Sequence, residues 1–88
     1  MKNKTLEFSK PFEKSFKKLP VKIREAVYNK LERYIANPKH PSLRVKKIKG
    51  TASIWEMSIT MNYRLTFEES ERFIFLRKIG THDLLNKP

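Results

Sequence analysis

The sequence contains no cysteine, so neither a disulfide bond nor a thiolate metal site can form. It also has no long hydrophobic run, since no stretch approaches the roughly 18 apolar residues that a bilayer-spanning helix needs. Residues 1–8 carry none of the apolar core of a signal peptide. These absences exclude disulfide scaffolds and membrane-spanning proteins, and we expect a soluble protein of the cytoplasm.

Acidic residues are scarce. The 88 residues include 20 Lys and Arg but only 9 Asp and Glu, which leaves a formal net charge of +11. This charge exceeds what solubility requires of a small domain, so a polyanion is the expected partner. Because neutralised phosphates release their counterions, such a surface should bind RNA or DNA with an affinity that falls as salt rises. Charge alone does not choose between nucleic acid, an anionic membrane and an acidic protein, and we favour nucleic acid.

The chain length fits one small domain, and we expect residues 1–88 to form it. Residues 5–8 alternate polar and apolar side chains, which is typical of a strand. A helix capped by Ser9 should follow and close at Pro20, because proline fits the first turn of a helix but not its interior. Residues 21–35 repeat an apolar stripe at helical spacing and predict a second helix.

The second half of the chain has the pattern of strands. A proline-bounded loop ends the helical part, and β-branched and aromatic residues then prevail. We predict a basic strand from Val45 to Gly50, strands over residues 54–59, 64–67 and 73–79, and a short helical turn at 81–86 capped by Thr81. This order predicts an α+β domain in which two N-terminal helices pack on one face of a mainly antiparallel sheet of about four to five strands. The other face of the sheet, or its lower rim, is expected to be free for a ligand.

The densest basic cluster of the chain is Lys46, Lys47 and Lys49, preceded by Arg44. Side chains alternate on a strand, so Lys47 and Lys49 should share one face while Lys46 points to the other. Two ammonium groups on one face can hold a phosphate, and Gly50 would let a backbone approach closely. The alternative is that these lysines protect an edge strand against pairing with another chain.

Three further side chains can act on a phosphate. Arg64 opens a later strand, where its guanidinium can bind two phosphate oxygens; the alternative is a surface ion pair. His82 follows the last strand and can give or take a proton near neutral pH, with a turn or capping role as the alternative. Glu56 can serve as a general base or, more simply, as the counter-charge of Lys47 or Arg64. No group of His, Asp and Glu has metal-ligand spacing, so neither a metal nor another cofactor is expected.

The aromatic residues either stack on bases or fill the core. Trp55, Tyr63 and Phe67 are candidates for base stacking, with core packing as the more common role of such residues. Four apolar side chains of the later strands are assigned entirely to packing: Phe67, Phe73, Phe75 and Ile79.

Four segments follow one another along the chain: a helical hairpin ending in Leu19-Pro20, then Lys47-Ile48-Lys49-Gly50, Tyr63-Arg64-Leu65 and Ile79-Gly80-Thr81-His82. In this order and at these separations they resemble the RelE/ParE toxin superfamily over nearly the whole chain. The Gly-Thr-His ending is most similar to the YafQ branch, and the Tyr-Arg-Leu segment to RelE and YoeB. The resemblance implies a β-α-α-β-β-β-β fold and the toxin of a type II toxin–antitoxin pair.

In the RNA-cleaving members of this family, the toxin enters the ribosomal A site and cuts mRNA without a metal, by attack of a 2′-hydroxyl on the adjacent phosphate. The resemblance implies that Arg64 stabilises the phosphate and that His82 acts as the acid or base. Lys47 and Lys49 would orient mRNA, contact ribosomal RNA or favour the attacking alkoxide. The implied RNA-binding residues are Arg44, Lys46, Lys47, Lys49 and Tyr63, and the secondary candidates are Glu56 and Asn86. Many members have an aromatic residue where this chain has Asn86, so base stacking is unassigned.

The resemblance also implies partners. These are mRNA, the ribosome with its RNA, and an antitoxin whose acidic or amphipathic segment covers the basic surface; no membrane is expected. Two alternatives stay open, a ParE-like inhibitor of DNA gyrase with the same fold and a non-catalytic RNA-binding module. The Lys-rich strand and His82 argue against the gyrase inhibitor.

Overall fold

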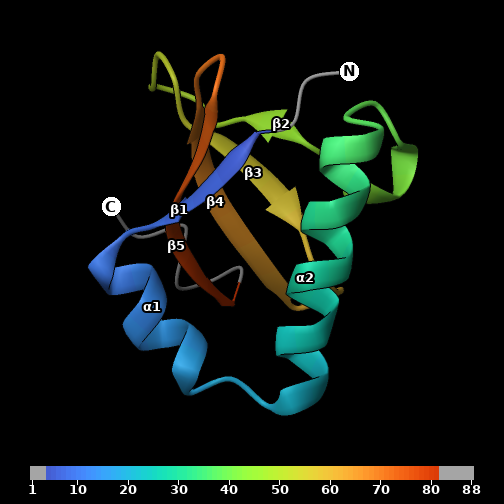
Figure 1. The fold of residues 1–88 in the computed structure, drawn as a ribbon, viewed down its shortest axis with the longest axis vertical. Helices are drawn as coiled ribbons and strands as arrows, with labels where there is room; N and C mark the ends of the chain where they lie inside the picture. Colours follow the sequence, from blue (N-terminus) through green and yellow to red (C-terminus); the bar gives the residue numbers. More distant parts are fainter. Residues whose placement is uncertain (1–3, 82–88) are drawn as a thin grey trace.

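Two helices lie across one face of a five-stranded sheet in the computed structural model, which describes residues 4–81 (Figure 1). The elements are β1 (Thr5–Phe8), α1 (Lys10–Lys17), α2 (Val21–Ala36), the 3₁₀ helix η1 (Pro41–Leu43), β2 (Lys46–Lys47), β3 (Trp55–Ser58), β4 (Tyr63–Glu69) and β5 (Phe73–Thr81). The predicted α+β class and the predicted order of elements are confirmed.

The sheet has the strand order β1-β5-β4-β3-β2. β1 runs parallel to β5, and every other neighbouring pair is antiparallel. The first strand of the chain therefore lies beside the last one, and the short β2 forms the opposite edge (Figure 1). Neither helix of the described chain is long and apolar enough to cross a membrane.

Ser9 starts α1 as predicted. Its Oγ accepts a hydrogen bond from the Phe12 N–H at 3.1 Å, and Pro11 lies in the first turn, where a missing N–H loses no helix bond. The helix ends at Lys17, earlier than expected, because Pro20 is not its last residue but the N-cap of α2. A short turn therefore separates the two helices.

Apolar side chains from both helices and from the central strands form the core. Its fully buried members are Phe12, Val27, Leu31, Leu43, Met57, Leu65, Phe67, Ile74 and Leu76. Phe67 and Ile79 lie in this core, as assigned from the sequence. The assignment of Phe73 and Phe75 to packing is wrong, since they are 42% and 39% exposed. Ile74 between them faces the core, so strand alternation turns both Phe rings to the other side.

A β-bulge in β5 changes which side chains face the core. Arg77 is skipped in the pairing with β4. Leu76 and Ile79, on either side of the bulge, are therefore both buried although they are an odd number of residues apart. The bulge is tied to α1, because the capping Ser9 donates its hydroxyl to the Arg77 carbonyl at 2.7 Å.

The predicted basic strand ending at Gly50 is much shorter than expected, because β2 contains only Lys46–Lys47. The chain then turns: the N–H and the hydroxyl of Thr51 both donate to the carbonyl of Ile48, at 3.3 and 2.7 Å. Gly50 takes a φ of 80°, a region that glycine enters without strain. Lys49 therefore lies in a turn and not in a strand.

β3, β4 and β5 confirm the three later strands, with ends that differ by a few residues from those predicted. Thr81, expected to cap a helical turn, is instead the last residue of β5. The rest of that predicted turn lies outside the described residues.

Candidate nucleic-acid interface

We call the face of the sheet that points away from the helices the distal face. In β4, Leu65 and Phe67 are fully buried in the core, so alternation turns Arg64 and Thr66 to the distal face. Residues directly opposite on neighbouring strands share a face, and Glu56 pairs with Thr66. Glu56 and Arg64 are therefore neighbours on this face.

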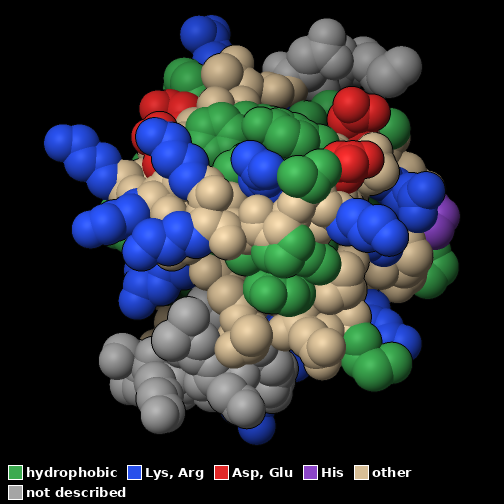
Figure 2. Space-filling model, turned by 90° about the horizontal axis from the view of Figure 1, so that it is seen from below, with side chains coloured by type: hydrophobic (Ala, Val, Ile, Leu, Met, Phe, Trp, Pro, Cys, Tyr) green, Lys and Arg blue, Asp and Glu red, His purple; other side chains and the backbone are tan. Residues whose placement is uncertain are grey.

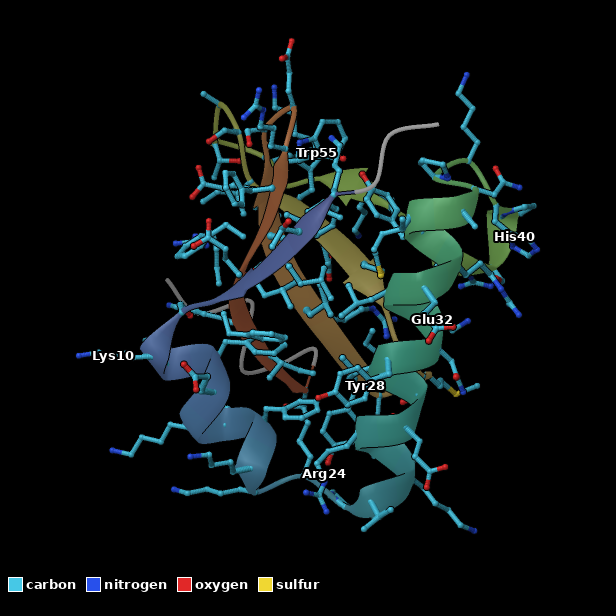
Figure 3. The ribbon with its side chains drawn as sticks, in the orientation of Figure 1. Lys10, Arg24, Tyr28, Glu32, His40 and Trp55 are labelled. Carbon is cyan, nitrogen blue, oxygen red and sulfur yellow. The ribbon has the colours of Figure 1, made fainter. Side chains whose placement is uncertain are left out.

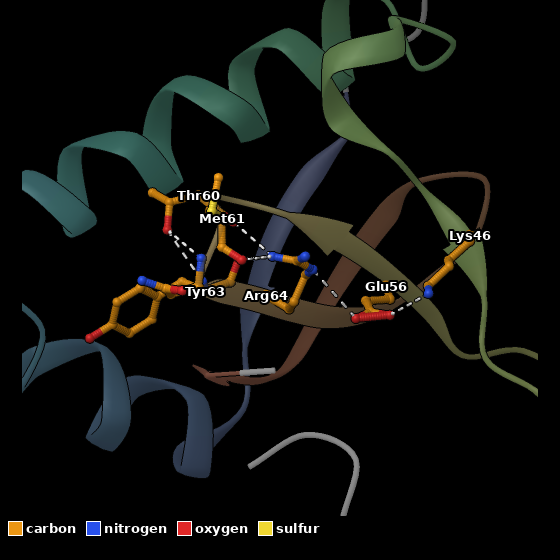
Figure 4. Close-up of polar contacts among 7 residues, drawn as sticks. Lys46, Glu56, Thr60, Met61, Tyr63 and Arg64 are labelled. Carbon is orange, nitrogen blue, oxygen red and sulfur yellow. Dashed lines mark hydrogen bonds and ion pairs between the residues drawn. The ribbon is translucent and has the colours of Figure 1, made fainter. Parts of the chain in front are cut away.

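The distal face carries three charged side chains in contact, Arg64, Glu56 and Lys46, which we name the distal cluster (Figure 4). The Glu56 carboxylate lies between the cations: its Oε1 is 3.9 Å from Arg64 Nε and its Oε2 is 3.7 Å from Lys46 Nζ. Only 8% of Glu56 is exposed, and burying a carboxylate costs free energy unless cations accompany it. This geometry favours the interpretation of Glu56 as a counter-charge.

The guanidinium of Arg64 is held by the turn between β3 and β4. Its Nη1 donates to the carbonyl oxygens of Thr60, Met61 and Tyr63 at 2.7, 3.0 and 3.2 Å (Figure 4). The Thr60 hydroxyl closes the same turn by accepting the N–H groups of Asn62 and Tyr63. The Nη2 of Arg64 has no hydrogen-bond partner among the described residues, so it is the donor left for an anion.

The structure does not bring Lys47 and Lys49 together with Arg64. Lys47 pairs with Trp55, whose own partner in β4 is a core residue, so alternation places Lys47 on the helix side of the sheet. Lys49 lies in the turn after β2, because the strand ends too early to include it. Lys46 is the member of the basic segment that shares the distal face with Arg64.

Two of the predicted site residues, His82 and Asn86, lie outside the described residues. Tyr63 is half-buried and packs against the core on the helix side. Trp55, labelled in Figure 3, is 36% exposed. It lines a hollow of about 580 Å³ that Tyr34 also borders. Neither Tyr63 nor Trp55 therefore offers a stacking surface next to the distal cluster.

A second group of cations surrounds a hollow of about 300 Å³ at the edge of the sheet, which we name the edge hollow. Arg64 lines it from β4, Lys30 from α2, and Arg44 from the segment after η1. Three hydroxyl-bearing side chains also line it: Ser42, Ser58 and Thr60. The sequence does not indicate Lys30 as a site residue, because its outward position on an amphipathic helix gives no sign that it approaches the sheet.

Cations and hydroxyl groups from several elements of the described chain can therefore bind an anion. Within residues 4–81, no three His, Asp or Glu side chains gather closely enough to hold a metal ion. Arg64 belongs both to the distal cluster and to the edge hollow, so the two groups of cations adjoin one another. Guanidinium and ammonium groups placed in this way can bind the oxygens of a phosphate through charge-assisted hydrogen bonds.

No protein-family model and no curated protein sequence matches the chain, but solved structures do. YoeB from Staphylococcus aureus matches with a TM-score of 0.79 and 15% identity, over 90% of this chain and 97% of that one. A chain of the RelB-RelE antitoxin-toxin complex from Methanococcus jannaschii matches with a TM-score of 0.70 and 24% identity, over 92% of this chain and 95% of that one. YafQ from E. coli matches with a TM-score of 0.69 and 18% identity, over 94% of this chain and 98% of that one. The chain has the RelE toxin fold.

Two of the segments that carry the resemblance to RelE meet in this fold. Across β4 and β5, Arg64 pairs with Gly80, and Tyr63 pairs with Thr81. The Tyr-Arg-Leu segment and the Gly-Thr step thus lie side by side, although many residues separate them in the sequence.

On this RelE fold, a row of lysines lies along α1 and at its C-cap. Lys10, Lys14, Lys17 and Lys18 line a hollow of about 480 Å³, with Glu13 as the acidic member. Figure 2 shows Lys and Arg side chains gathered on the side of the molecule where α1 lies. The sequence contains the signal for this row, since lysines four and three residues apart share a helix face.

Tyr34 joins α2 to the sheet at the end away from the β3–β4 turn. Its hydroxyl donates to Glu69 of β4, whose other carboxylate oxygen pairs with Lys4. Burial, together with this hydrogen bond and the nearby charge of Glu69, raises the pKa of the Tyr34 phenol above its ordinary value of 10.0. We assign this group to the stability of the fold, because it lies apart from the distal cluster.

Proposed function

We propose that this chain is the toxin of a type II toxin–antitoxin pair and an endoribonuclease that cuts mRNA on the ribosome. The RelE fold and the net charge of +11 support a toxin that works on RNA. The observation that carries the proposal is the position of Arg64, anchored at Nη1 by the β3–β4 turn and paired at Nε with Glu56. A cation held in this way needs little reorganisation to stabilise charge on a phosphate.

In the proposed reaction, the 2′-oxygen of one nucleotide attacks the adjacent phosphorus, and the 5′-oxygen of the next nucleotide leaves. A base takes the proton of the 2′-hydroxyl and an acid protonates the leaving oxygen, so the products are a 2′,3′-cyclic phosphate and a 5′-hydroxyl. Arg64 stabilises the charge that develops on the phosphate oxygens. We assign one of the two proton transfers to His82.

The predicted RNA-binding residues take different places in this proposal. Lys46 belongs to the distal cluster and contacts RNA close to the cut. Lys47 on the helix side of β2 and Lys49 in the following turn bind mRNA or ribosomal RNA farther from it. Arg44 contributes from the edge hollow, and Tyr63 supports the turn that holds the catalytic cation.

An antitoxin is the second proposed partner. The M. jannaschii structure with this fold is a RelB-RelE antitoxin-toxin complex. The cation surplus of this chain favours a partner segment rich in acidic residues, because complementary charge speeds association and suppresses wrong partners.

The test is primer extension on a defined mRNA in a translating extract, with and without the purified protein, and on the same mRNA without ribosomes. We expect cuts on the translated message only. Arg64→Ala should remove them, since losing one donor to the transition state costs on the order of 100-fold or more. Arg77→Ala is the matched control, because Arg77 also pairs with a glutamate, Glu68 at 3.6 Å, but lies outside the distal cluster.

The absence of cuts in both reactions would overturn the proposal. Stalled gyrase–DNA complexes would then support the ParE-like alternative. RNA binding that weakens with salt, without growth arrest on expression, would support the non-catalytic binding module.

A further inference from the structure

The edge hollow exists because β2 is short. β2 pairs only with the first half of β3, so among residues 4–81 no strand lies on the outer side of β3 at Ser58. α2 contributes Lys30 at this bare edge, and the segment after η1 contributes Arg44. Arg64 reaches the same hollow from β4 as the cross-strand partner of Ser58. Three segments far apart in the sequence thus place cations around one space.

No carboxylate lines the edge hollow within the part of the chain that the structure describes. Two other hollows of the described surface do contain carboxylates, Glu13 in one, Glu69 and Glu71 in the other. The edge hollow instead combines its cations with hydroxyl groups, and the Ser58 hydroxyl has no hydrogen-bond partner among residues 4–81. A lining of this kind attracts an oxyanion and gives it both charge and hydrogen-bond donors.

Hydrogen bonds fix the wall of the hollow before any ligand binds. Lys30 Nζ donates to the carbonyl of Ser42 at 3.4 Å, and Arg33 Nη1 donates to the Ser42 hydroxyl at 3.2 Å. The Nδ1 of His40, at the outer end of α2 (Figure 3), lies 2.8 Å from the same hydroxyl. These contacts hold η1 against α2, so the segment that carries Arg44 is positioned in advance.

Arg44 has a backbone conformation that favours glycine. Its φ of 46° and ψ of 48° lie in the left-handed region, and it is the only residue other than glycine with a positive φ among residues 4–81. Its guanidinium makes no hydrogen bond or ion pair with any described residue. The side chain therefore strains the backbone without stabilising the fold, which points to a ligand as the reason for an arginine here.

We propose that the edge hollow binds a phosphodiester group of RNA, with Arg44 and Lys30 joining Arg64 as its ligands. The choice of RNA rests on the proposed function, whereas the preference for an oxyanion rests on the lining alone. Because Arg64 also belongs to the distal cluster, the RNA strand passes over the bare edge of β3.

The test measures binding without cleavage. A fluorescent single-stranded RNA with 2′-O-methyl groups lacks the attacking hydroxyl, so its affinity can be followed by anisotropy over a series of salt concentrations. Arg44→Gly removes the guanidinium and relieves the backbone, and Lys30→Gln removes the ammonium group. Lys22→Gln is the matched control, because it removes one positive charge from an exposed position of the same helix, outside the hollow.

Arg44→Gly and Lys30→Gln should each weaken RNA binding roughly tenfold, as expected for one charge-assisted hydrogen bond. Each should also reduce the slope of log affinity against log salt by about 0.7, the value for one phosphate contact on a single strand. Lys22→Gln should leave the affinity and the slope close to those of the wild type. Arg44→Gly should unfold at the wild-type temperature or higher, which a structural role of Arg44 would not allow.

RNA affinities of Arg44→Gly and Lys30→Gln equal to that of Lys22→Gln would overturn the phosphate site, as would a wild-type protein that binds no RNA. A second result would overturn the phosphate site in favour of an acidic protein partner. In that result, a polyglutamate peptide binds the wild type but neither of these two variants, while their RNA affinity is unchanged. The proposed function is tested separately. If no cuts appear in the translating extract but the two variants lose RNA affinity as expected, the nuclease is rejected and the phosphate site is supported.

Discussion

Arg64 combines two roles in one side chain. Its Nη1 binds three carbonyl oxygens of the β3–β4 turn, and its Nε faces Glu56. A guanidinium can serve the turn and a phosphate together because its donors form a rigid fork, whereas the ammonium group of lysine is a single point charge. We therefore infer that the turn orients the cation for its ligand.

Glu56→Gln distinguishes a counter-charge from a general base. We expect the variant to cut mRNA within about tenfold of the wild-type rate, because the turn still holds Arg64, whereas loss of a general base costs about 100-fold or more. The measurement is the cleavage rate as a function of pH. Glu68→Gln is the control, since Glu68 also accepts a cation, Arg77. A large loss that also removes the acidic limb of the pH profile would identify Glu56 as the base.

The sequence predicts that Lys47 and Lys49 lie beside Arg64, whereas the residue of the basic segment on the distal face is Lys46. That prediction requires one strand that runs to Gly50, but β2 ends at Lys47. Because faces alternate, the contact with Glu56, which also pairs with Arg64, falls to a residue one position away, Lys46. The length of β2 depends on the turn that follows it, so local pattern alone could not decide the face.

At the scale of elements, Ser9 couples α1 to the sheet. Ser9→Ala removes both the cap bond to the Phe12 N–H and the bond to the Arg77 carbonyl at the bulge of β5. We expect a loss of about 2 kcal/mol in the free energy of unfolding, measured by urea denaturation. Ser15→Ala in the same helix is the control, and it should be neutral or slightly stabilising because alanine is the better helix former. Equal effects of the two substitutions would contradict the coupling.

Tyr34 makes the join between α2 and β4 sensitive to alkaline pH. Its pKa is raised in the folded state, mainly by burial, so its contribution to stability is complete below the unfolded value of about 10 and is lost as pH rises above it. The loss is at most about 1.4 kcal/mol per pH unit. Tyr34→Phe should lower the free energy of unfolding by about 1 kcal/mol at neutral pH. Above about pH 10, this free energy should fall less steeply with pH in the variant than in the wild type.

Urea denaturation at neutral and alkaline pH checks this prediction. The titration of lysines affects both proteins equally, so the difference between them isolates the phenol. Parallel declines of the wild type and Tyr34→Phe above about pH 10 would mean that the Tyr34 hydroxyl ionises as easily in the folded protein as in the unfolded one.

The elements were predictable where local signals agree and unpredictable where distant contacts decide. The cap at Ser9 and the apolar stripe of α2 gave both helices. The bulge at Arg77 gave no such signal, because it depends on how β5 meets β4 and α1. The apolar run that contains Phe73 and Phe75 shows no alternation, so their exposure could not be read from it.

At the scale of the whole molecule, the order of elements predicts the α+β layers but not the neighbours in the sheet. The parallel pairing of β1 with β5 joins the first and last strands, and nothing local in either strand specifies it. The edge hollow is beyond sequence reading for the same reason, since Lys30, Arg44 and Arg64 come from separate elements. The charge of the chain, by contrast, is known from composition alone.

This charge sets a whole-molecule prediction. Ion pairs within residues 4–81 involve only three carboxylates, those of Glu56, Glu68 and Glu69, against a net charge of +11. Repulsion among the unpaired cations opposes folding, and salt screens it. We expect the midpoint of thermal unfolding to rise between about 50 mM and about 500 mM NaCl, while RNA affinity falls over the same range.

Opposite responses follow because the same cations are repelled by one another in the free protein and attracted to phosphates in the complex. Melting curves followed by circular dichroism and anisotropy titrations with one RNA, both on a single preparation, measure the two trends together. A melting temperature that falls with salt would show that attraction between charges within the fold outweighs repulsion. The excess positive charge would then stabilise the fold. A rise would show that the fold tolerates this charge at a cost in stability, as expected if the cations serve a polyanionic partner.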